Sequence, residues 1–479
     1  MTIHKRSLLR AGLSISAALA GRASGITTAA EAEACDRPSV AGELSCEAAV
    51  IAAAADDFGH IIRQRPQAVL KPISAPDIAR LIRWAGMRGL KVAARGQGHS
   101  TYGRATAAGG VVLDMTSMRT IHHVHSDRAV VDAGATWSAV LDTTLAHGLT
   151  PPVLPNYLDL SVGGTLAVGG IGGTTFRHGM VADNVLELQV VTGDGHERTC
   201  SAQANADLFD AVRAGLGQCA VITRATLRLV PAPERVRRCQ LFYRDLGALS
   251  ADQRTVLADG RFDALQGAII GDGAGGWRYQ LEGLAFYSGP SAAADNAILS
   301  GLSDERSAAA IVDATYVEDV HALAQLEQRL RSNGQWFNPH PWLLTFLPGS
   351  NAEPIASELL KGLTNADVGA FGRITYYPLR TTSVRAPLVR MPEEDIAFPF
   401  NLIRIPASDD RAEAERMVAD NRALYERIRG AGGVKYPVSA LPMSPADWKQ
   451  HFGANWQLLH DAKRRYDPLG MLTPGYDVF

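Results

Sequence analysis

The segment Arg95–Ser100, which reads Arg-Gly-Gln-Gly-His-Ser, has residue types and spacing that could bind a phosphorylated ligand. Glycines at 96 and 98 let backbone amides approach an anion without interference from a Cβ atom, which suits a pyrophosphate group. The segment is not a P-loop, because no Gly-Lys-Ser/Thr follows it, and no helix clearly begins where a Rossmann fingerprint requires one. By itself the pattern is also typical of an ordinary turn, and a lone loop histidine is usually a solvated surface residue.

A second glycine-rich segment, residues 161–173, reads Ser-Val-Gly-Gly-Thr-Leu-Ala-Val-Gly-Gly-Ile-Gly-Gly. It is too rich in glycine for a strand or a helix that only packs against a core. Such a segment suits close approach of the backbone to a flat, extended ligand. A flexible linker is the alternative, but the interleaved valine, leucine and isoleucine residues argue against it.

Several strands and helices must position these two segments. Residues 91–95 form a predicted strand that ends at the first glycine segment, and residues 75–85 form a predicted helix with apolar positions at helical spacing. Further apolar runs predict strands at 111–115, 129–133, 184–192 and 220–230, and a short helix at 206–213. The order of elements is therefore mixed α and β.

The proline-rich residues 231–234 are a candidate domain boundary. After them the chain alternates strand-like and helical pieces, which indicates an antiparallel sheet under helices. The predicted strands are 277–286, 373–378 and 396–405, and the predicted helices are 316–330 and 411–429.

Composition excludes some partners. The 479 residues contain 47 Lys and Arg against 49 Asp and Glu, so the net charge is −2 and no strong field attracts a nucleic acid or an anionic membrane. After the N-terminal leader, no apolar run reaches the roughly 18 residues that span a bilayer. The cysteines lack metal-ligand spacing, so no metal site is predicted, and Cys200, Cys219 and Cys239 are expected to be buried apolar residues.

The first 34 residues read as a signal peptide, with Lys5-Arg6, an apolar run to Ala20, and small residues near 30–32. The sequence around Lys5-Arg6 resembles a twin-arginine export signal with lysine replacing the first arginine. The mature protein is then expected to be periplasmic or secreted. A mobile amphipathic N-terminus is the alternative reading. In an oxidising compartment, Cys35 and Cys46 could form a disulfide across a short loop.

The motifs as a set resemble the FAD-binding domain of the vanillyl-alcohol-oxidase-type flavoproteins, and among these most closely the cytokinin dehydrogenases. The resemblance covers nearly the whole mature chain in the right order. It rests on Gly-x-Gly-His-Ser at 96–100, Val-Gly-Gly-Thr-Leu at 162–166, Phe-Arg-His-Gly at 176–179, Asn-Val-Leu-Glu-Leu at 184–188, Val-Thr-Gly at 191–193, Asp-Leu-Phe at 207–209, Gly-Leu-Gly-Gln at 215–218, His-Pro-Trp-Leu at 340–343, His-Phe-Gly at 451–453, Tyr-Asp-Pro at 466–468 and Thr-Pro-Gly at 473–475.

The resemblance implies an α+β fold in which a two-subdomain FAD-binding domain of the PCMH type carries an inserted substrate domain, an antiparallel sheet covered by helices. It places the FAD-binding domain at residues 35–235 and the substrate domain at 236–440. Residues 441–479 then return to the FAD-binding domain.

The resemblance also implies FAD, bound covalently through His99. Such a link raises the redox potential of the flavin and prevents its loss. Doubly linked relatives of the berberine-bridge type carry a cysteine where this chain has Gly163, so a single link is expected. The residues expected to contact FAD are Arg95, Gly96, Gln97, Gly98, His99, Ser100, Gly103, Gly164, Thr165, Gly169, Gly170 and Ile222.

One position departs from the family pattern. Cytokinin dehydrogenases carry an aspartate in Trp-Thr-Asp-Tyr-Leu, where it accepts the proton of the substrate amine, and this chain has Asn156 there. An amide can bind an amine but cannot take its proton at neutral pH. Either the proton acceptor lies elsewhere, with Asp159 and Glu282 as candidates, or the substrate is not a cytokinin. Each carboxylate also has a plain alternative, Asp159 as a solvated loop residue and Glu282 as a paired strand residue.

The resemblance implies an FAD-dependent oxidase or dehydrogenase that moves a hydride from a carbon bearing an amine or hydroxyl to flavin N5. An N6-substituted adenine is the first choice of substrate, and Asn156 predicts that N6-isopentenyladenine is turned over slowly or not at all. A related oxidase of an alcohol, a sugar or an alkaloid-like amine is the second choice, and a non-catalytic flavin carrier is the third. The electron acceptor, oxygen or a quinone-like molecule, is left open, because no motif reports the access of oxygen to the flavin.

Overall fold

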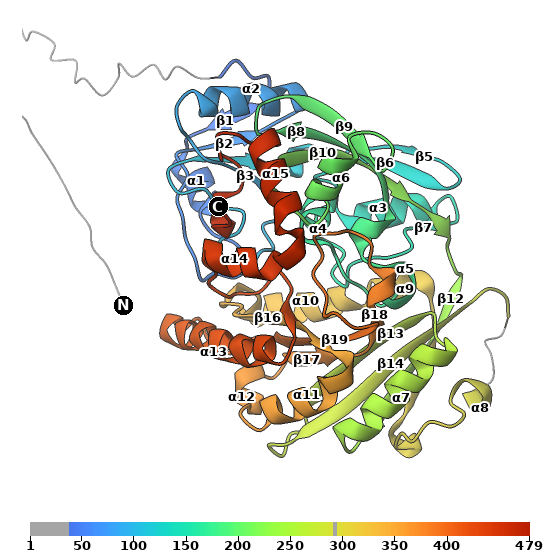
Figure 1. Ribbon diagram of the computed structural model, residues 1–479. Coiled ribbons are helices and arrows are strands. Elements are labelled where there is room, and N and C mark those ends of the chain that lie inside the picture. The colour runs from blue at the N-terminus through green and yellow to red at the C-terminus, as the bar shows by residue number, and fades with distance from the viewer. Residues whose placement is uncertain (1–37, 291–294) are drawn as a thin grey trace, which may run out of the picture. The chain divides into compact units, whose positions relative to one another are not determined.

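The computed structural model describes residues 38–290 and 295–479, and residues Ser39–Phe479 form one unit. The described residues form four β-sheets with helices packed around them, which confirms the mixed α+β fold (Figure 1). Leader residues 1–34 and Cys35 lie outside the described residues, so the predicted Cys35–Cys46 disulfide has no structural account here. Within the described part of the chain, no helix combines the length and the apolar character that crossing a membrane requires.

The first sheet positions the first glycine segment, Arg95–Ser100. It has the order β1-β2-β4-β3, with β1 antiparallel and the others parallel. The apolar face of α2 (Ala75–Gly86), with Ile78, Leu81 and Ile82 fully buried, packs against this sheet, so β3 ends in a fixed place. The strands are β1 (Glu43–Ser45), β2 (Ala68–Lys71), β3 (Val92–Arg95) and β4 (Val111–Asp114), and α1 (Ala48–Ala54) packs on β2.

The second sheet has the order β5-β6-β10-β8-β9 and is antiparallel throughout. Its register shifts between Ile222 and Arg224, which bends β10 beside the second glycine segment. The strands are β5 (Ile121–Val124), β6 (Arg128–Asp132), β8 (Val185–Thr192), β9 (Glu197–Ser201) and β10 (Ala220–Arg228). The accompanying helices are α3 (Trp137–Leu145), α4 (Val162–Val168), α5 (Thr175–His178) and α6 (Ala206–Val212), and β7 (Leu149–Thr150) pairs with β11 (Val230–Pro231).

The third large sheet contains nine antiparallel strands in the order β15-β12-β14-β13-β17-β19-β16-β20, with β18 paired to β19. The helices α7, α11 and α13 pack against it. The strands are β12 (Arg235–Tyr243), β13 (Ala264–Gly271), β14 (Trp277–Tyr287), β15 (Ala310–Thr315), β16 (Leu343–Pro348), β17 (Arg373–Tyr376), β18 (Leu379–Arg380), β19 (Ile396–Ile403) and β20 (Val434–Lys435). The helices of this region are α7 (Leu246–Asp259), α8 (Asp295–Ile298), α9 (Tyr316–Val320), α10 (Ala322–Ser332), α11 (Ala352–Leu360), α12 (Asn365–Val368) and α13 (Arg411–Gly430).

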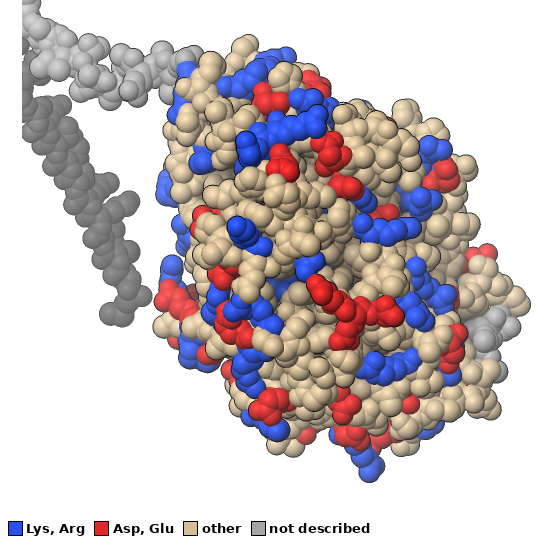
Figure 2. Space-filling model, in the orientation of Figure 1, with Lys and Arg blue, Asp and Glu red and all other residues tan. Residues whose placement is uncertain are grey.

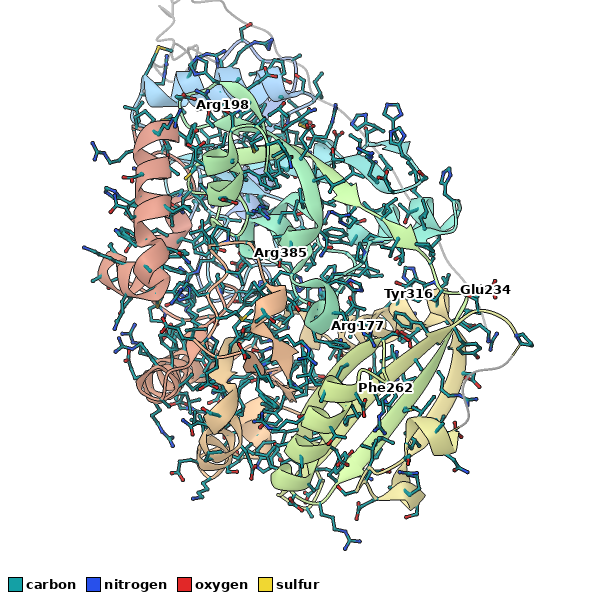
Figure 3. All side chains as sticks on the ribbon, turned by 45° about the vertical axis from the view of Figure 1, so that its right-hand side comes forward. Arg177, Arg198, Glu234, Phe262, Tyr316 and Arg385 are labelled. Atoms are coloured by element: carbon teal, nitrogen blue, oxygen red, sulfur yellow. The ribbon has the colours of Figure 1, made fainter. Side chains whose placement is uncertain are left out.

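Hydrogen bonds connect the glycine-rich half of the chain to the nine-stranded sheet. The guanidinium of Arg177, on α5, donates to the carbonyl oxygens of Gly260 and Phe262, the latter at 2.6 Å (Figure 3). The hydroxyls of Thr150 and Tyr316 lie 3.1 Å apart within a hydrogen bond. These contacts fix the position of the nine-stranded sheet opposite the two glycine segments.

The C-terminal residues pack against the first two sheets. The Val92 amide donates to the Met471 carbonyl, and the Thr473 amide donates to the Val92 carbonyl. Helix α15 (Trp456–Tyr466) contacts α6, while α14 (Pro445–Phe452) precedes it. The division of the chain at 235 and 440 into separate domains remains a prediction.

Two local predictions differ from the structure. The single helix predicted at 316–330 is interrupted at His321, which ends α9 and begins α10. Part of the second glycine segment is helical, as α4. Its Gly163 allows this because a Cβ atom there would lie 2.9 Å from the Cβ of Ala133, so only glycine lets the helix approach Ala133, which follows β6, so closely.

Acidic and basic side chains are interspersed over the face shown in Figure 2, with no large area of one sign. Cys200, Cys219 and Cys239 are buried and unpaired, which confirms the prediction made for them, whereas Cys46 is exposed.

Candidate active site

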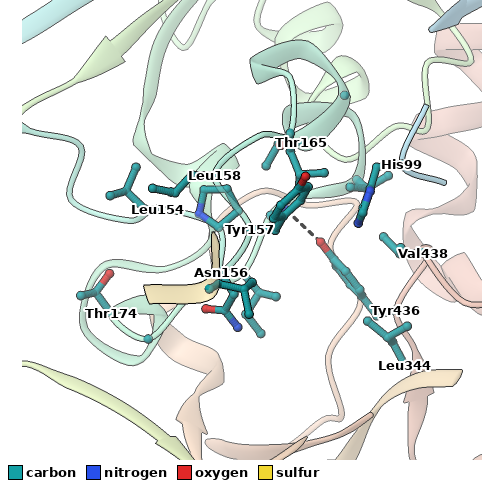
Figure 4. A pocket seen from close by; sticks show the side chains of 18 of the residues that line it. His99, Leu154, Asn156, Tyr157, Leu158, Thr165, Thr174, Leu344, Tyr436 and Val438 are labelled. Atoms are coloured by element: carbon teal, nitrogen blue, oxygen red, sulfur yellow. Dashed lines mark hydrogen bonds between the residues drawn. The ribbon is translucent and has the colours of Figure 1, made fainter. Parts of the chain in front are cut away.

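A cavity of about 1440 Å³ lies between the two glycine segments and the nine-stranded sheet. Pockets for one small ligand usually measure about 300–1,000 Å³. The volume is therefore sufficient for a large cofactor together with a substrate. Figure 4 shows His99, Tyr157 and Tyr436 turned toward the same space.

The first glycine segment forms one wall of this cavity, and every residue from Arg95 to Ser100 lines it. Backbone amides 96–100 donate no hydrogen bond to any acceptor in residues 38–290 or 295–479. A Cβ atom at Gly96 would overlap the hydroxyl of Ser161, and Gly98 has a φ of +67° and faces the guanidinium of Arg95. Glycine is thus required at both positions, and the resulting loop presents free N–H groups to an anion.

Asp57 fixes the shape of this loop through hydrogen bonds that its carboxylate accepts. Its carboxylate accepts hydrogen bonds from the Ser100 hydroxyl at 2.7 Å and from the amides of Gly103 at 2.6 Å and Gly59 at 3.0 Å. Burial raises the pKa of Asp57 to about 6, and the same hydrogen bonds oppose that rise. Gly103 therefore contributes to the loop through Asp57 and does not line the cavity.

His99 is half-buried, with aromatic rings around it. The ring of Phe58 stacks on it with centroids 3.9 Å apart and planes inclined by 20°, and the Tyr157 ring lies at 4.8 Å. Removal from water, together with the positive charge of Arg331 and the neighbouring His340, lowers the pKa of His99 to about 3. The imidazole is therefore neutral at pH 7 and has a nitrogen lone pair free to react.

The second glycine segment supplies the opposite wall. Gly164, Thr165 and Gly170 line the cavity, as does Ile222 of β10. Gly170 has a φ of +73°, and its amide donates to the Tyr436 hydroxyl at 3.0 Å (Figure 4). Gly169 has a φ of +105° where α4 ends and does not line the cavity. The predicted cofactor residues thus come together, with Gly103 and Gly169 as supports of the loops.

The residues present fit FAD. Free amides in the first glycine segment suit the pyrophosphate, and the neutral imidazole of His99 suits the isoalloxazine ring. The walls between them are mainly apolar, as a flat ring system requires.

The three predicted catalytic residues do not all reach the cavity. Asp159 is exposed, accepts a hydrogen bond from the Ser138 hydroxyl at 2.5 Å, and does not line the cavity. Asn156 and Glu282 both line it. The Asn156 carbonyl oxygen accepts a hydrogen bond from Gln266 at 2.8 Å, and Gln266 lies directly opposite Glu282 in the pairing of β13 with β14.

Glu282 is held by two polar partners on the neighbouring strand β12. The Gln240 amide donates to it at 3.1 Å, and the guanidinium of Arg238 lies 3.6 Å away. Arg238 also binds Asp319 at 2.7 Å, and burial raises the pKa of the Asp319 carboxyl. Glu282 is therefore a fixed carboxylate on a rigid sheet, facing the cavity.

Sequence reasoning missed several cavity residues. Phe58 precedes the first recognised motif by nearly forty positions, and Glu327 and Trp336 lie in or beside a helix with no distinctive pattern. Tyr157 was visible only as the neighbour of Asn156, yet its hydroxyl donates to Glu327. The helical spacing of Leu323, Leu326 and Leu330, all of which line the cavity, was the one available signal.

Two buried histidines should make the stability of the fold sensitive to acid. Burial lowers the pKa of both His340 and His451 to about 3, well below the usual value of about 6.5. Below that usual value the unfolded chain binds more protons than the native chain, so the free energy of unfolding falls as the pH decreases. Each imidazole contributes about 1.4 kcal/mol per pH unit. Asp57, with its pKa of about 6, has the opposite effect. Between about pH 4 and 6 the native chain binds at most one proton more than the unfolded chain at this residue, which raises the free energy of unfolding as the pH decreases.

Urea titrations between about pH 5 and 6 would test this, with His451→Phe as the variant, because neither ring nitrogen of His451 has a hydrogen-bond partner among the described residues. The slope of unfolding free energy against pH should fall by about 1.4 kcal/mol per unit. The exposed His123→Gln serves as the control and should keep the original slope. An unchanged slope for His451→Phe would contradict the prediction.

Comparison with known proteins agrees with this geometry. Residues 66–201 match the family described as FAD binding domain, and residues 273–479 match the family described as cytokinin dehydrogenase 1, FAD and cytokinin binding. The chain is 44% identical to an uncharacterized oxidoreductase, ORF5 in the fasciation locus of Rhodococcoides fascians, over 89% of this chain and 96% of the relative. It is 38% identical to cytokinin dehydrogenase 10 of Oryza sativa subsp. japonica, over 89% and 86%.

A solved structure shares the fold. The crystal structure of 6-hydroxy-D-nicotine oxidase from Arthrobacter nicotinovorans superimposes with a TM-score of 0.71 over 92% of this chain and 98% of that one, at 21% identity. Identity this low is informative about the fold alone. The sequence relatives and the family matches carry the assignment further: the chain belongs to the cytokinin dehydrogenase family of FAD-dependent oxidoreductases.

Proposed function

We propose that this enzyme oxidises the side-chain amine of an N6-substituted adenine, with FAD held covalently at His99 and Glu282 as the proton acceptor. When bound, FAD accepts the hydride that leaves the substrate carbon. The observation that carries the proposal is the row Asn156–Gln266–Glu282 on the cavity wall, which puts an amide and a carboxylate beside one another. Asn156 can orient the amine, and Glu282 can take its proton.

The cavity wall supports an apolar, flat substrate. Leu323, Leu326 and Leu330 form one face of α10, and Trp336 and Trp342 lie nearby. Indole rings stack on planar heterocycles, and leucines favour a hydrocarbon side chain. The names of the relatives agree with a purine carrying an apolar substituent.

The test is a substrate screen by anaerobic reduction of the flavin. Purified holoprotein mixed with N6-isopentenyladenine should lose its yellow colour, but slowly, because Asn156 replaces the family aspartate. Adenine, which has no side chain to oxidise, is the control. A protein that stays yellow with every N6-substituted adenine would overturn the substrate assignment. If alcohols and sugars also leave the flavin yellow, the protein does not act as an oxidase on compounds of these classes.

A second candidate function follows from Asn156. Because the family aspartate is absent, the site is also compatible with an alcohol, a sugar or an alkaloid-like amine. The same screen separates the two, since bleaching by one of these compounds and not by adenines would favour the second candidate.

Covalent attachment predicts a clear result for His99→Ala. The wild-type protein should stay yellow after acid precipitation, because a carbon–nitrogen bond survives denaturation. The variant should release all of its flavin under the same treatment. Measurement of absorbance near the flavin band in pellet and supernatant decides the point, and flavin retained by the variant would refute the attachment.

The leader predicts export. Mature protein from the native host should begin near residues 33–36 and be recovered in the periplasm or the medium. Peptide mass spectrometry of the N-terminus provides the measurement. An intact Met1 on cytoplasmic material would contradict the expectation.

A further inference from the structure

We infer that Phe58 is a positioning residue for flavin attachment: wedged between His99 and His340, it holds the imidazole of His99 in the orientation from which the covalent bond forms. This inference rests on the attachment at His99 proposed above. It assigns a role to a residue that lies outside both glycine segments.

Both faces of the Phe58 ring stack on histidine rings. The ring stacks on His99 with centroids 3.9 Å apart and planes at 20°, and on His340 with centroids 3.8 Å apart and planes at 21°. The indoles of Trp336 and Trp342 close the sides at 5.0 and 5.3 Å. The three stacked rings therefore form a column with buried His340 at one end and half-buried His99 at the other, and all three residues line the cavity.

Backbone hydrogen bonds connect the column to the first glycine segment. The Phe58 amide donates to the Gly98 carbonyl at 2.8 Å, and the Gly59 amide donates to the Ser100 carbonyl at 3.0 Å. On the other side, the His340 amide donates to the Gly59 carbonyl at 2.9 Å. Residues 58 and 59 thus connect the residues on either side of His99 to the loop that carries His340.

The side chain of His340 adds a directional contact. Its Nδ1 lies 2.9 Å from the Phe58 carbonyl oxygen, and a carbonyl only accepts, so this nitrogen carries the hydrogen. His340 is 1% exposed, so it cannot turn to another partner in solvent. Phe58 is therefore fixed by its backbone and by its ring, and it can fix His99 in turn.

Attachment needs such a fixed imidazole. Formation of the bond joins an imidazole nitrogen to a methyl carbon of the flavin, while the N–H hydrogen and one methyl hydrogen, with one electron pair, pass to the flavin ring system. Dioxygen then accepts those two electrons and two protons. A misplacement of reacting atoms by about 1 Å can cost about 10²-fold in rate, so loss of the stack should slow attachment more than it weakens binding.

The experiment compares full-length Phe58→Leu, Phe58→Tyr and wild type, each isolated with its flavin. Leucine keeps apolar volume but removes the ring, and tyrosine restores the ring. Total FAD per chain is measured after proteolysis, the covalent share after acid precipitation, and the midpoint potential by dye titration. Phe398→Leu is the matched control, because Phe398 is fully buried and packs on the Tyr376 ring at 4.9 Å without lining the cavity.

Phe58→Leu should bind FAD but keep less than about a tenth of it covalently, with a lowered midpoint potential, whereas Phe58→Tyr and Phe398→Leu should match the wild type. Full covalent attachment in Phe58→Leu would overturn the inference, and so would loss of non-covalent FAD, which would make Phe58 a binding residue. If that variant fails to fold, His340→Leu, which removes the backing ring, should show the same loss of covalent flavin, and full attachment there would overturn the inference. Acid-released flavin in the wild type would instead refute attachment at His99.

Discussion

Replacing Glu282 by glutamine should lower the rate of anaerobic flavin reduction by about 10²- to 10⁴-fold, the usual contribution of a general base. Glutamine keeps the volume and can still bind a polar group, but it cannot take a proton at neutral pH. The partners Gln240 and Arg238 remain in place, so the sheet around position 282 should be preserved. Stopped-flow measurement with the best N6-substituted adenine gives the rate.

Asp159→Asn provides the matched control for this variant. It makes the same change from carboxylate to amide, three residues from Asn156, on an exposed side chain that does not line the cavity. Its reduction rate should equal that of the wild type. A slow Asp159→Asn together with a fast Glu282→Gln would reverse the assignment of the proton acceptor.

The fold was largely predictable, because the apolar pattern of most segments favours the same strand or helix that the packing of the protein requires. Apolar runs ending at glycine or proline predicted β3, β8, β10 and β14 nearly to the residue. The break at His321 was missed because the apolar positions continue at helical spacing through it. The weak helix formers Tyr316, Val317 and Val320 lie before the break, and strong helix formers follow it. The helix within the second glycine segment was missed for a similar reason: helix propensity argues against Gly163, and the close contact with Ala133 overrides it.

The site was predictable in part. The glycines that shape the site could be recognised in the sequence. A left-handed φ, or a contact too close for a Cβ atom, accepts few residues other than glycine, as at Gly98 and Gly170. The choice between Asp159 and Glu282 could not be made, because it depends on which carboxylate faces the cavity. Phe58 gave no signal either, since a buried phenylalanine in a stack has the same sequence signature as one in any core.

Replacing Asn156 by aspartate should raise the rate of flavin reduction by N6-isopentenyladenine, which we expect to be slow in the unmodified protein. The new carboxylate would occupy the place where the family carries its proton acceptor, and it could still accept the hydrogen bond from Gln266. It would also lie close to Glu282, because Gln266 and Glu282 are directly opposed in their strands.

The Glu282→Gln background isolates the effect of Asn156→Asp. There the new aspartate is the one carboxylate of the pair, and it should restore about 10²-fold or more of the rate that Glu282→Gln loses. Recovery in the double variant would show that the two positions serve one proton-transfer step from neighbouring places on the cavity wall. Fast oxidation by the unmodified protein would show that Glu282 alone is sufficient. No gain in either background would indicate that the amine does not bind beside residue 156, and the alcohol, sugar or alkaloid-like substrates of the second candidate function would then be preferred.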